Sequence, residues 1–122
     1  LGGGNGNDFL DGGSGNDSLV GGDGSDKFVY RFATLASTGI DYIIDFTSGD
    51  LIYFDDPSAS GPLASSAFVA GANALDADDR FIYHAATKSL YYDKDGNGAE
   101  SKVQIAILDN GYALNAGDVM LF

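Results

Sequence analysis

The chain has 122 residues, and its 18 acidic and 6 basic residues give a net charge of −12 at pH 7. This charge argues against binding to nucleic acid or to anionic membranes, and the absence of cysteine excludes stabilisation by disulfides. Hydrophobic residues make up 44% of the chain, which suffices for one packed domain or for a short repeat array with its cap. No apolar run is long enough for membrane insertion.

Three consecutive nonapeptides occupy residues 3–29, and they read GGNGNDFLD, GGSGNDSLV and GGDGSDKFV. Each follows the pattern G-G-x-G-x-D-x-U-x, in which U is a large apolar residue. The nine-residue period predicts six residues of turn and a three-residue strand whose U side chain points inward. Each glycine costs about 0.5–1 kcal/mol relative to alanine, more than three leucine-sized side chains offset. The turns therefore need a further source of stability.

Three aspartates, Asp8, Asp17 and Asp26, share the same period. If the repeats wind with two repeats per turn, Asp8 and Asp26 stack about 4.8 Å apart and repel each other unless a cation lies between them. Carboxylate and carbonyl oxygens in a flexible loop favour Ca²⁺ over softer metals. A flexible Gly/Asp-rich linker is the alternative, but it does not explain an apolar residue at every ninth position. The repeats therefore predict calcium as the cofactor.

The repeats closely resemble the RTX (repeats-in-toxin) family. The resemblance implies a parallel β-roll in which Ca²⁺ binds between turns, held by backbone carbonyls and by the aspartates of two stacked repeats. It assigns one complete site to Gly3, Asn5, Asp8, Gly22, Gly24 and Asp26. The second repeat contributes Gly12, Ser14 and Asp17 but has no repeat partner on either side. Its site is either half-built or completed by the segment that follows.

The segment after the repeats reads as strands. Phe28–Phe32 is predicted to leave the roll, Ile40–Phe46 to form a buried strand, and Leu51–Phe54 to form its partner across a turn. The motif DYIIDF resembles a segment that often follows the last RTX repeat, which suggests that Asp45 and Asp41 complete a terminal calcium site. Alternatively, both are solvated carboxylates at a strand edge.

The C-terminal half contains a predicted antiparallel meander of three strands. These strands are Arg80–His84, Leu90–Asp93 and Lys102–Leu108, and they resemble the cap of many RTX proteins. Before them, Pro62–Ala74 is rich in Ala and Ser and could hold one short helix anchored by Phe68 and Val69.

A run of polar residues after the second meander strand, Asp93, Asp95 and Asn97, fits the first half of an EF-hand loop. The twelfth position of that loop is Gln104 instead of glutamate, which favours an ordinary hairpin loop over a calcium site.

The last predicted elements lie in the C-terminal tail. Tyr112–Ala116 is expected to form a helical turn and Asp118–Phe122 a last strand, which by resemblance serves as a type I secretion signal. The one histidine, His84, lies in a predicted strand, so no catalytic site and no enzyme activity are predicted.

The chain is predicted to be all-β, with a short parallel β-roll at residues 1–32 and a mostly antiparallel β cap at residues 33–122. The resemblance implies a secreted, calcium-binding C-terminal RTX region that folds on Ca²⁺ after export by the type I machinery, an ABC transporter complex. The alternative is a calcium-dependent module that binds extracellular polysaccharide or acts in adhesion.

Overall fold

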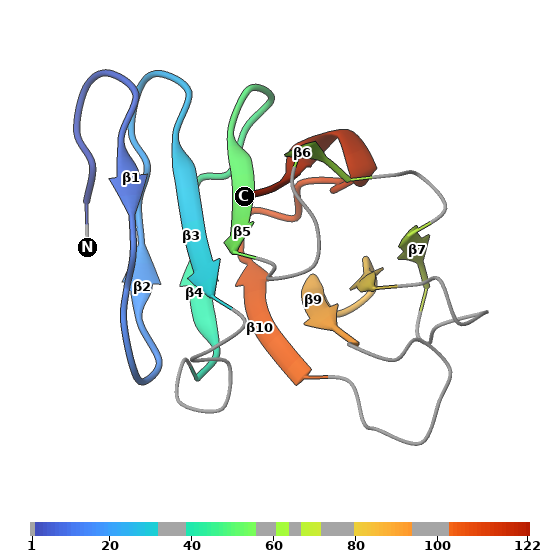
Figure 1. The fold of residues 1–122 in the computed structure, drawn as a ribbon. Helices are drawn as coiled ribbons and strands as arrows, with labels where there is room; N and C mark the ends of the chain where they lie inside the picture. Colours follow the sequence, from blue (N-terminus) through green and yellow to red (C-terminus); the bar gives the residue numbers. More distant parts are fainter. Residues whose placement is uncertain (1, 32–38, 56–60, 64–66, 72–79, 94–102) are drawn as a thin grey trace.

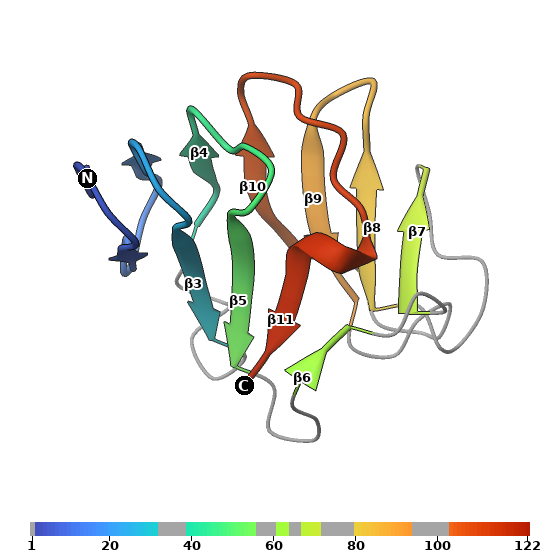
Figure 2. The ribbon, with the colours of Figure 1, turned by 90° about the horizontal axis from the view of Figure 1, so that it is seen from above.

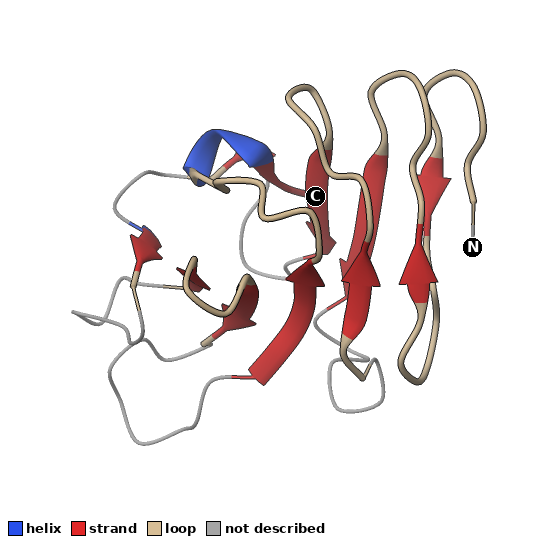
Figure 3. Cartoon of the chain, turned by 180° about the vertical axis from the view of Figure 1, so that it is seen from behind, coloured by secondary structure: helices blue, strands red, loops and turns tan. Residues whose placement is uncertain are grey.

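The computed structural model describes residues 2–31, 39–55, 61–63, 67–71, 80–93 and 103–122. These residues form strands and connecting loops with almost no helix, as Figures 1 and 3 show. The all-β prediction is confirmed. The strands are β1 (Phe9–Leu10), β2 (Ser18–Leu19), β3 (Lys27–Arg31), β4 (Asp41–Ile43), β5 (Leu51–Asp55), β6 (Gly61–Pro62), β7 (Phe68–Ala70), β8 (Phe81–His84), β9 (Ser89–Tyr92), β10 (Val103–Leu108) and β11 (Val119–Leu121).

The strands form two sheets that face each other across the core (Figure 2). One sheet has the order β1-β3-β5-β11-β6 and the other the order β2-β4-β10-β9-β8-β7. The first five strands alternate between the sheets, and each pairs in parallel with the strand two places before it. The chain therefore winds with two strands per turn, and its connecting loops stack at the two ends of the strands.

The inward-facing residue of each repeat lies in a row that crosses its sheet. Leu10 pairs with Phe28, Phe28 with Ile52, and Ile52 with Val119. In the opposite sheet, Leu19, Ile43 and Leu108 form the matching row. Every member of both rows is at most 1% exposed. The predicted inward position of the U residue is therefore confirmed, and the same position continues into β4 and β5.

The predicted pairing of Ile40–Phe46 with Leu51–Phe54 is wrong, because β4 and β5 lie in different sheets. β4 pairs in parallel with β2 and β10, whereas β5 pairs in parallel with β3 and β11. The turn between them crosses from one sheet to the other, as the turns between the nonapeptide strands do. Parallel pairing therefore continues past residue 32, where the roll was predicted to end.

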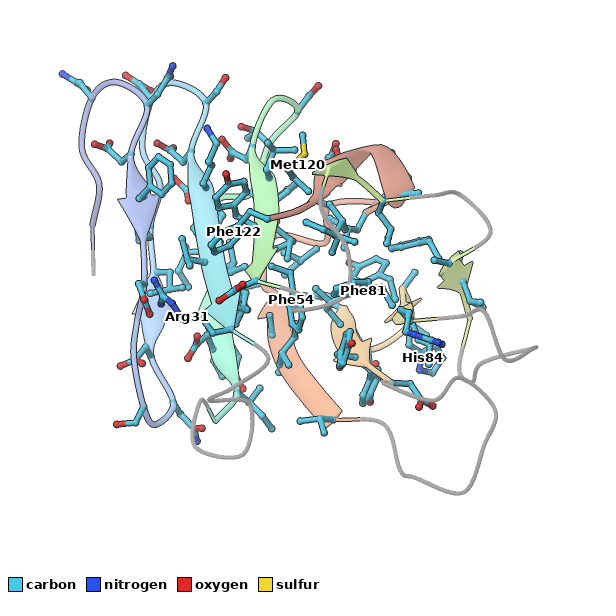
Figure 4. All side chains as sticks on the ribbon, in the orientation of Figure 1. Arg31, Phe54, Phe81, His84, Met120 and Phe122 are labelled. Carbon is cyan, nitrogen blue, oxygen red and sulfur yellow. The ribbon has the colours of Figure 1, made fainter. Side chains whose placement is uncertain are left out.

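The predicted meander is present as β8, β9 and β10, which pair in antiparallel fashion. β10 also pairs in parallel with β4, so the meander continues the sheet that begins at β2. In Figure 4, Phe54 and Phe81 lie in the interior between the sheets; their ring centroids are 5.2 Å apart.

Two local predictions differ from the structure. Phe68 and Val69 lie in strand β7 instead of a helix. The helical turn near the C-terminus is a 3-10 helix, η3 (Ala116–Asp118), one turn later than predicted. Asp95 and Asn97 of the candidate EF-hand loop lie outside the described residues. Among the described residues, no helix has the length and apolarity that crossing a membrane requires.

Candidate metal centre

The glycine-rich turns stack closely where the chain passes from one sheet to the other. We call residues 3–8 turn one, 12–17 turn two and 21–26 turn three. Gly24 of turn three has φ +107°, and an ideal Cβ there would lie 2.3 Å from the carbonyl oxygen of Gly6 in turn one. Gly39 lies against Gly15 of turn two in the same way, at 2.4 Å. Only glycine permits both this conformation and this approach of two backbones.

The aspartates form a ladder that links each turn to the turn stacked on it. The backbone N–H of Asp8 donates to Oδ1 of Asp26 at 2.9 Å, across 18 residues. The N–H of Asp17 donates to Oδ1 of Asp41 at 3.0 Å, and this contact spans 24 residues. Asp41 therefore takes the position in the stack that the aspartate of a further repeat would take, displaced by six residues (24 − 18). The segment after the repeats supplies the partner that turn two lacks.

A third contact of this type extends the ladder to Asp50, a residue that the sequence reasoning missed. The N–H of Asp26 donates to Oδ1 of Asp50 at 2.8 Å, again across 24 residues. Asp41 and Asp50 are nine residues apart, and Ile43 and Ile52 follow each of them by two residues, as U follows Asp in the repeats. This resumed nine-residue period was a readable signal, hidden by the six extra residues.

Asparagines at the fifth motif position form a second ladder that was also missed. Oδ1 of Asn7 accepts a hydrogen bond from the N–H of Ser25 at 2.7 Å. Oδ1 of Asn16 accepts from the N–H of Ile40 at 2.8 Å. The recurrence of asparagine at this position in the first two repeats could have indicated the role.

Three other carbonyls lie between turns one and three. The carbonyl oxygens of Gly4 and Gly6 lie 2.2 and 2.3 Å from the ideal Cβ positions of Gly22 and Gly24, so they are directed from turn one towards turn three. The carbonyl oxygen of Gly21 lies 2.8 Å from the ideal Cβ of Gly3 and is directed the opposite way. These three carbonyls are candidate ligands that the sequence reasoning did not select.

The predicted ligands other than the aspartates also lie in the turns. Asn5 bridges to Asp23 through the backbone, and Ser14 is exposed in turn two. Gly12 lies beside its own aspartate, because its ideal Cβ would be 2.7 Å from Oδ2 of Asp17. The roles of Gly3, Asn5, Gly12, Ser14, Gly22 and Gly24 as ligands stay predictions.

One carboxylate oxygen in each glycine-rich turn is buried without a hydrogen-bond partner. These atoms are Oδ2 of Asp8, Asp17 and Asp26. Asp26 is fully buried, and burial raises the pKa of its carboxyl, as do the neighbouring carboxylates of Asp50, Asp8 and Asp45. Burial also raises the pKa of Asp41 to about 6. No ion pair among the described residues involves any of these aspartates, so their charge has no compensating cation within that part of the protein.

The Tyr30 hydroxyl is a fourth buried side-chain atom without a hydrogen bond of good geometry. Burial raises the pKa of Tyr30, and the neighbouring Asp41 carboxylate raises it further, through its charge and through its interaction with the hydroxyl. The hydroxyl therefore lies beside Asp41 and is a weak partner for its carboxylate.

Asp45 differs from the other predicted ligands. Its two carboxylate oxygens accept hydrogen bonds from the N–H groups of Gly21 and Gly22, at 2.8 and 2.9 Å. Both oxygens are therefore occupied by the protein, and the assignment of Asp45 as a ligand stays a prediction.

The donor set fits Ca²⁺. Among the described residues, no three acidic or histidine side chains converge closely enough to hold a metal by themselves. A site between stacked turns would therefore combine two carboxylates with backbone carbonyls, which is the all-oxygen donor set that calcium takes. A buried carboxylate oxygen without a partner costs free energy, and a bound cation removes that cost.

Comparison with known proteins supports this interpretation for the N-terminal part of the chain. Residues 2–30 match the family model described as RTX calcium-binding nonapeptide repeat (4 copies). The search of curated proteins and the search of solved structures gave no match. RTX nonapeptide repeats bind Ca²⁺. The N-terminal part of this chain therefore belongs to the RTX family of calcium-binding nonapeptide repeats.

Proposed function

We propose that this chain is a calcium-dependent RTX region whose turns fold around bound Ca²⁺ after export from the cell. In this proposal, Asp8 and Asp26 provide the carboxylates of one site, and Asp17 and Asp41 those of a second. Carbonyls of the stacked turns complete each site. In the same proposal the repeat region is a parallel β-roll and β8–β10 belong to its cap, which the parallel pairing of β1–β5 and the antiparallel pairing of β8–β10 support.

The observation that carries the proposal is the set of three buried Oδ2 atoms without partners, one per repeat. Folded proteins seldom bury a carboxylate oxygen without a hydrogen-bond partner, because such an oxygen loses the free energy of its hydration. Three such atoms at the same motif position indicate a ligand that recurs with the repeat.

The folding behaviour follows from linkage. A ligand that binds only the folded state stabilises it in proportion to the logarithm of its concentration. At the low free Ca²⁺ inside a cell the turns would retain their electrostatic repulsion. At extracellular Ca²⁺, sites with dissociation constants of roughly 10⁻⁴–10⁻³ M would fill. The turns would then pass the type I secretion machinery unfolded and fold outside.

The proposed secretion signal lies at the C-terminal end, in residues 118–122. In the folded chain β11 pairs with β5, and Val119 and Leu121 are buried. Export of a passenger fused to residues 74–122 by cells with a type I exporter supports the signal. Equal export after deletion of residues 118–122 contradicts it.

The direct test of the calcium proposal is far-UV circular dichroism of the 122-residue chain across a Ca²⁺ titration, with Mg²⁺ as the control. We expect a cooperative gain of β signal at about 0.1–1 mM Ca²⁺ and little change with Mg²⁺, which tolerates irregular oxygen sites poorly. A chain that binds no Ca²⁺ by calorimetry contradicts the proposal.

A second candidate function is binding of extracellular polysaccharide, which one surface feature favours. Phe9 is 65% exposed, and its ring lies 5.6 Å from that of Tyr53, which stacks at 4.2 Å on Phe122. Lys27 lies 5.1 Å above the Phe9 ring. A contiguous group of exposed aromatic rings is an unusual feature that often marks a binding surface.

Binding of the calcium-loaded chain to neutral and anionic glycans tests this candidate. Binding that is lost in Phe9→Ala, with unchanged calcium affinity, supports it. No binding to any glycan by either protein removes it.

A further inference from the structure

The turn at residues 45–50 satisfies its carboxylates in a different way from turns one, two and three. Oδ1 of Asp45 accepts from the N–H of Gly21, and Oδ2 accepts from the N–H of Gly22. The Asp45 side chain therefore fixes two consecutive amides at the start of turn three. Hydrogen bonds from N–H groups to a carboxylate are among the stronger ones in proteins.

Asp50 closes the other end of the same turn. Its Oδ1 accepts from the N–H of Asp26 at 2.8 Å, and its Oδ2 accepts from the N–H of Thr47 at 2.9 Å and from the Thr47 hydroxyl at 3.3 Å. Asp50 is 1% exposed, yet none of its oxygens lacks a partner. The two aspartates together accept five hydrogen bonds, three from turn three and two from Thr47.

The contrast with the glycine-rich turns carries the inference. Turns one, two and three each have a buried carboxylate oxygen without a partner, whereas residues 45–50 have none. Backbone N–H groups therefore donate to both carboxylate oxygens of Asp45 and of Asp50. The Oδ2 atoms of the repeat aspartates accept no hydrogen bond.

We propose that Asp45 is a positioning residue that holds turn three in place without metal. The inference rests on the proposed calcium sites for this contrast. By fixing the N–H groups of Gly21 and Gly22, Asp45 orients the peptide between them, whose carbonyl is directed towards turn one. It acts on the site between turns one and three through this peptide.

The test uses three variants of the full chain: Asp45→Asn, Asp41→Asn as a change at a proposed ligand, and Asp23→Asn as a control. Asp23 is an exposed aspartate in turn three. Bound Ca²⁺ is counted by calorimetry at saturation. Exchange of the Gly21 and Gly22 amides is followed by NMR, and unfolding by urea is measured in chelator.

We expect Asp45→Asn to bind as many Ca²⁺ ions as the parent, at a higher midpoint. In chelator the folded-to-unfolded ratio should fall by roughly tenfold, the effect of losing one charge-assisted hydrogen bond. Exchange of the Gly21 and Gly22 amides should quicken by a similar factor. Asp41→Asn should lose one ion and keep both amides protected, and Asp23→Asn should change neither quantity.

Loss of one Ca²⁺ ion in Asp45→Asn would overturn the inference, because Asp45 would then be a ligand. Unchanged exchange of the two glycine amides would also overturn it. If the metal-free chain gives no folded baseline in urea, the ion count at saturation still decides. Failure of the calcium proposal itself would appear separately, as a parent chain that binds no Ca²⁺.

Discussion

The buried polar groups of the stacked turns, which lie in residues 3–26 and 45–50, and those of the meander β8–β9–β10 differ in whether they have hydrogen-bond partners. In the meander, the Tyr83 hydroxyl donates to the carbonyl of Tyr112 at 2.7 Å, and Gln104 donates to the Ser89 hydroxyl at 3.0 Å. All four unpartnered buried side-chain atoms of the described residues lie between residues 8 and 30. The described residues of the meander have no unpartnered buried side-chain atom, whereas turns one, two and three have one each. Calcium should therefore control the stability of one region and not of the other.

The apolar interior shows the same division. The meander side of the core contains an aromatic cluster in which Phe54 stacks on Tyr92 at 4.6 Å and Phe81 meets Phe54 at 5.2 Å. On the repeat side, each nonapeptide repeat contributes one inward residue, such as Leu10 or Leu19. Burial of large aromatic rings stabilises a fold by several kcal/mol each without any metal. A single leucine per nine residues, six of them in turns, provides far less.

The largest expected effect is that of truncating the aromatic cluster. Phe81→Ala removes a fully buried ring and should destabilise the chain by about 3–5 kcal/mol. The loss should be equal in Ca²⁺ and in chelator, since no calcium ligand is near. Urea unfolding in both conditions measures it, and Phe9→Ala, a 65% exposed ring, is the control. A loss that appears in one condition alone would break the proposed division.

An intermediate effect is expected where two turns touch. Gly24→Ala and Gly6→Ala both place alanine at a positive φ, which costs roughly 1–2 kcal/mol. The Cβ at residue 24 would also meet the Gly6 carbonyl at 2.3 Å, whereas the Cβ at residue 6 would meet nothing within 4 Å. Gly24→Ala should therefore cost about 1–3 kcal/mol more than Gly6→Ala. Calcium-saturated urea unfolding gives this difference, and equal losses would mean that the turns do not stack closely.

The strands of the repeats and the meander could be predicted because their patterns are local. Leu10, Leu19 and Phe28 recur every nine residues, and Leu90–Tyr92 and Val103–Leu108 are apolar, β-branched or aromatic runs bounded by turns. The pairing of β4 and β5 was not local. DYIIDF and LIYF, separated by a four-residue turn, satisfy the sequence criteria for a hairpin, and only the stack beneath them selects parallel pairing.

The candidate site shows a similar limit. The periodic aspartates were accessible from spacing, whereas Asp41 was suggested by the resemblance of DYIIDF to a segment that follows RTX repeats. Asp50 was missed because six extra residues displace the repeat register, although it follows Asp41 by nine. The carbonyls of Gly4, Gly6 and Gly21 could not be selected, because peptide orientation depends on the φ values of the glycines and not on their identity alone.

The smallest but most specific expected effect is that of removing one charge. Asp26→Asn keeps an oxygen that can accept from the Asp8 N–H but loses the carboxylate. With calcium it should raise the Ca²⁺ midpoint about tenfold, which is roughly 1.4 kcal/mol. In chelator Asp26→Asn should leave the free energy of unfolding unchanged or increase it, because it removes a buried charge that neighbouring carboxylates repel.

A destabilisation by Asp26→Asn that appears in calcium and is absent or reversed in chelator distinguishes a ligand from an ordinary structural residue. The change Asp23→Asn, at an exposed position of the same turn, serves as the control. Equal destabilisation of Asp26→Asn in calcium and in chelator would argue that Asp26 acts only through its hydrogen bond to Asp8.

Amide hydrogen exchange with and without calcium tests most directly whether the two regions differ. The N–H of Lys27 donates to the carbonyl of Asp8 within the stacked turns, and the N–H of Asp93 donates to the carbonyl of Arg80 beside the meander, both at 2.8 Å. We predict that both amides are protected in Ca²⁺ and that chelator removes the protection of Lys27 but not of Asp93. Protection of both amides in chelator, or its loss at both together, would contradict the account.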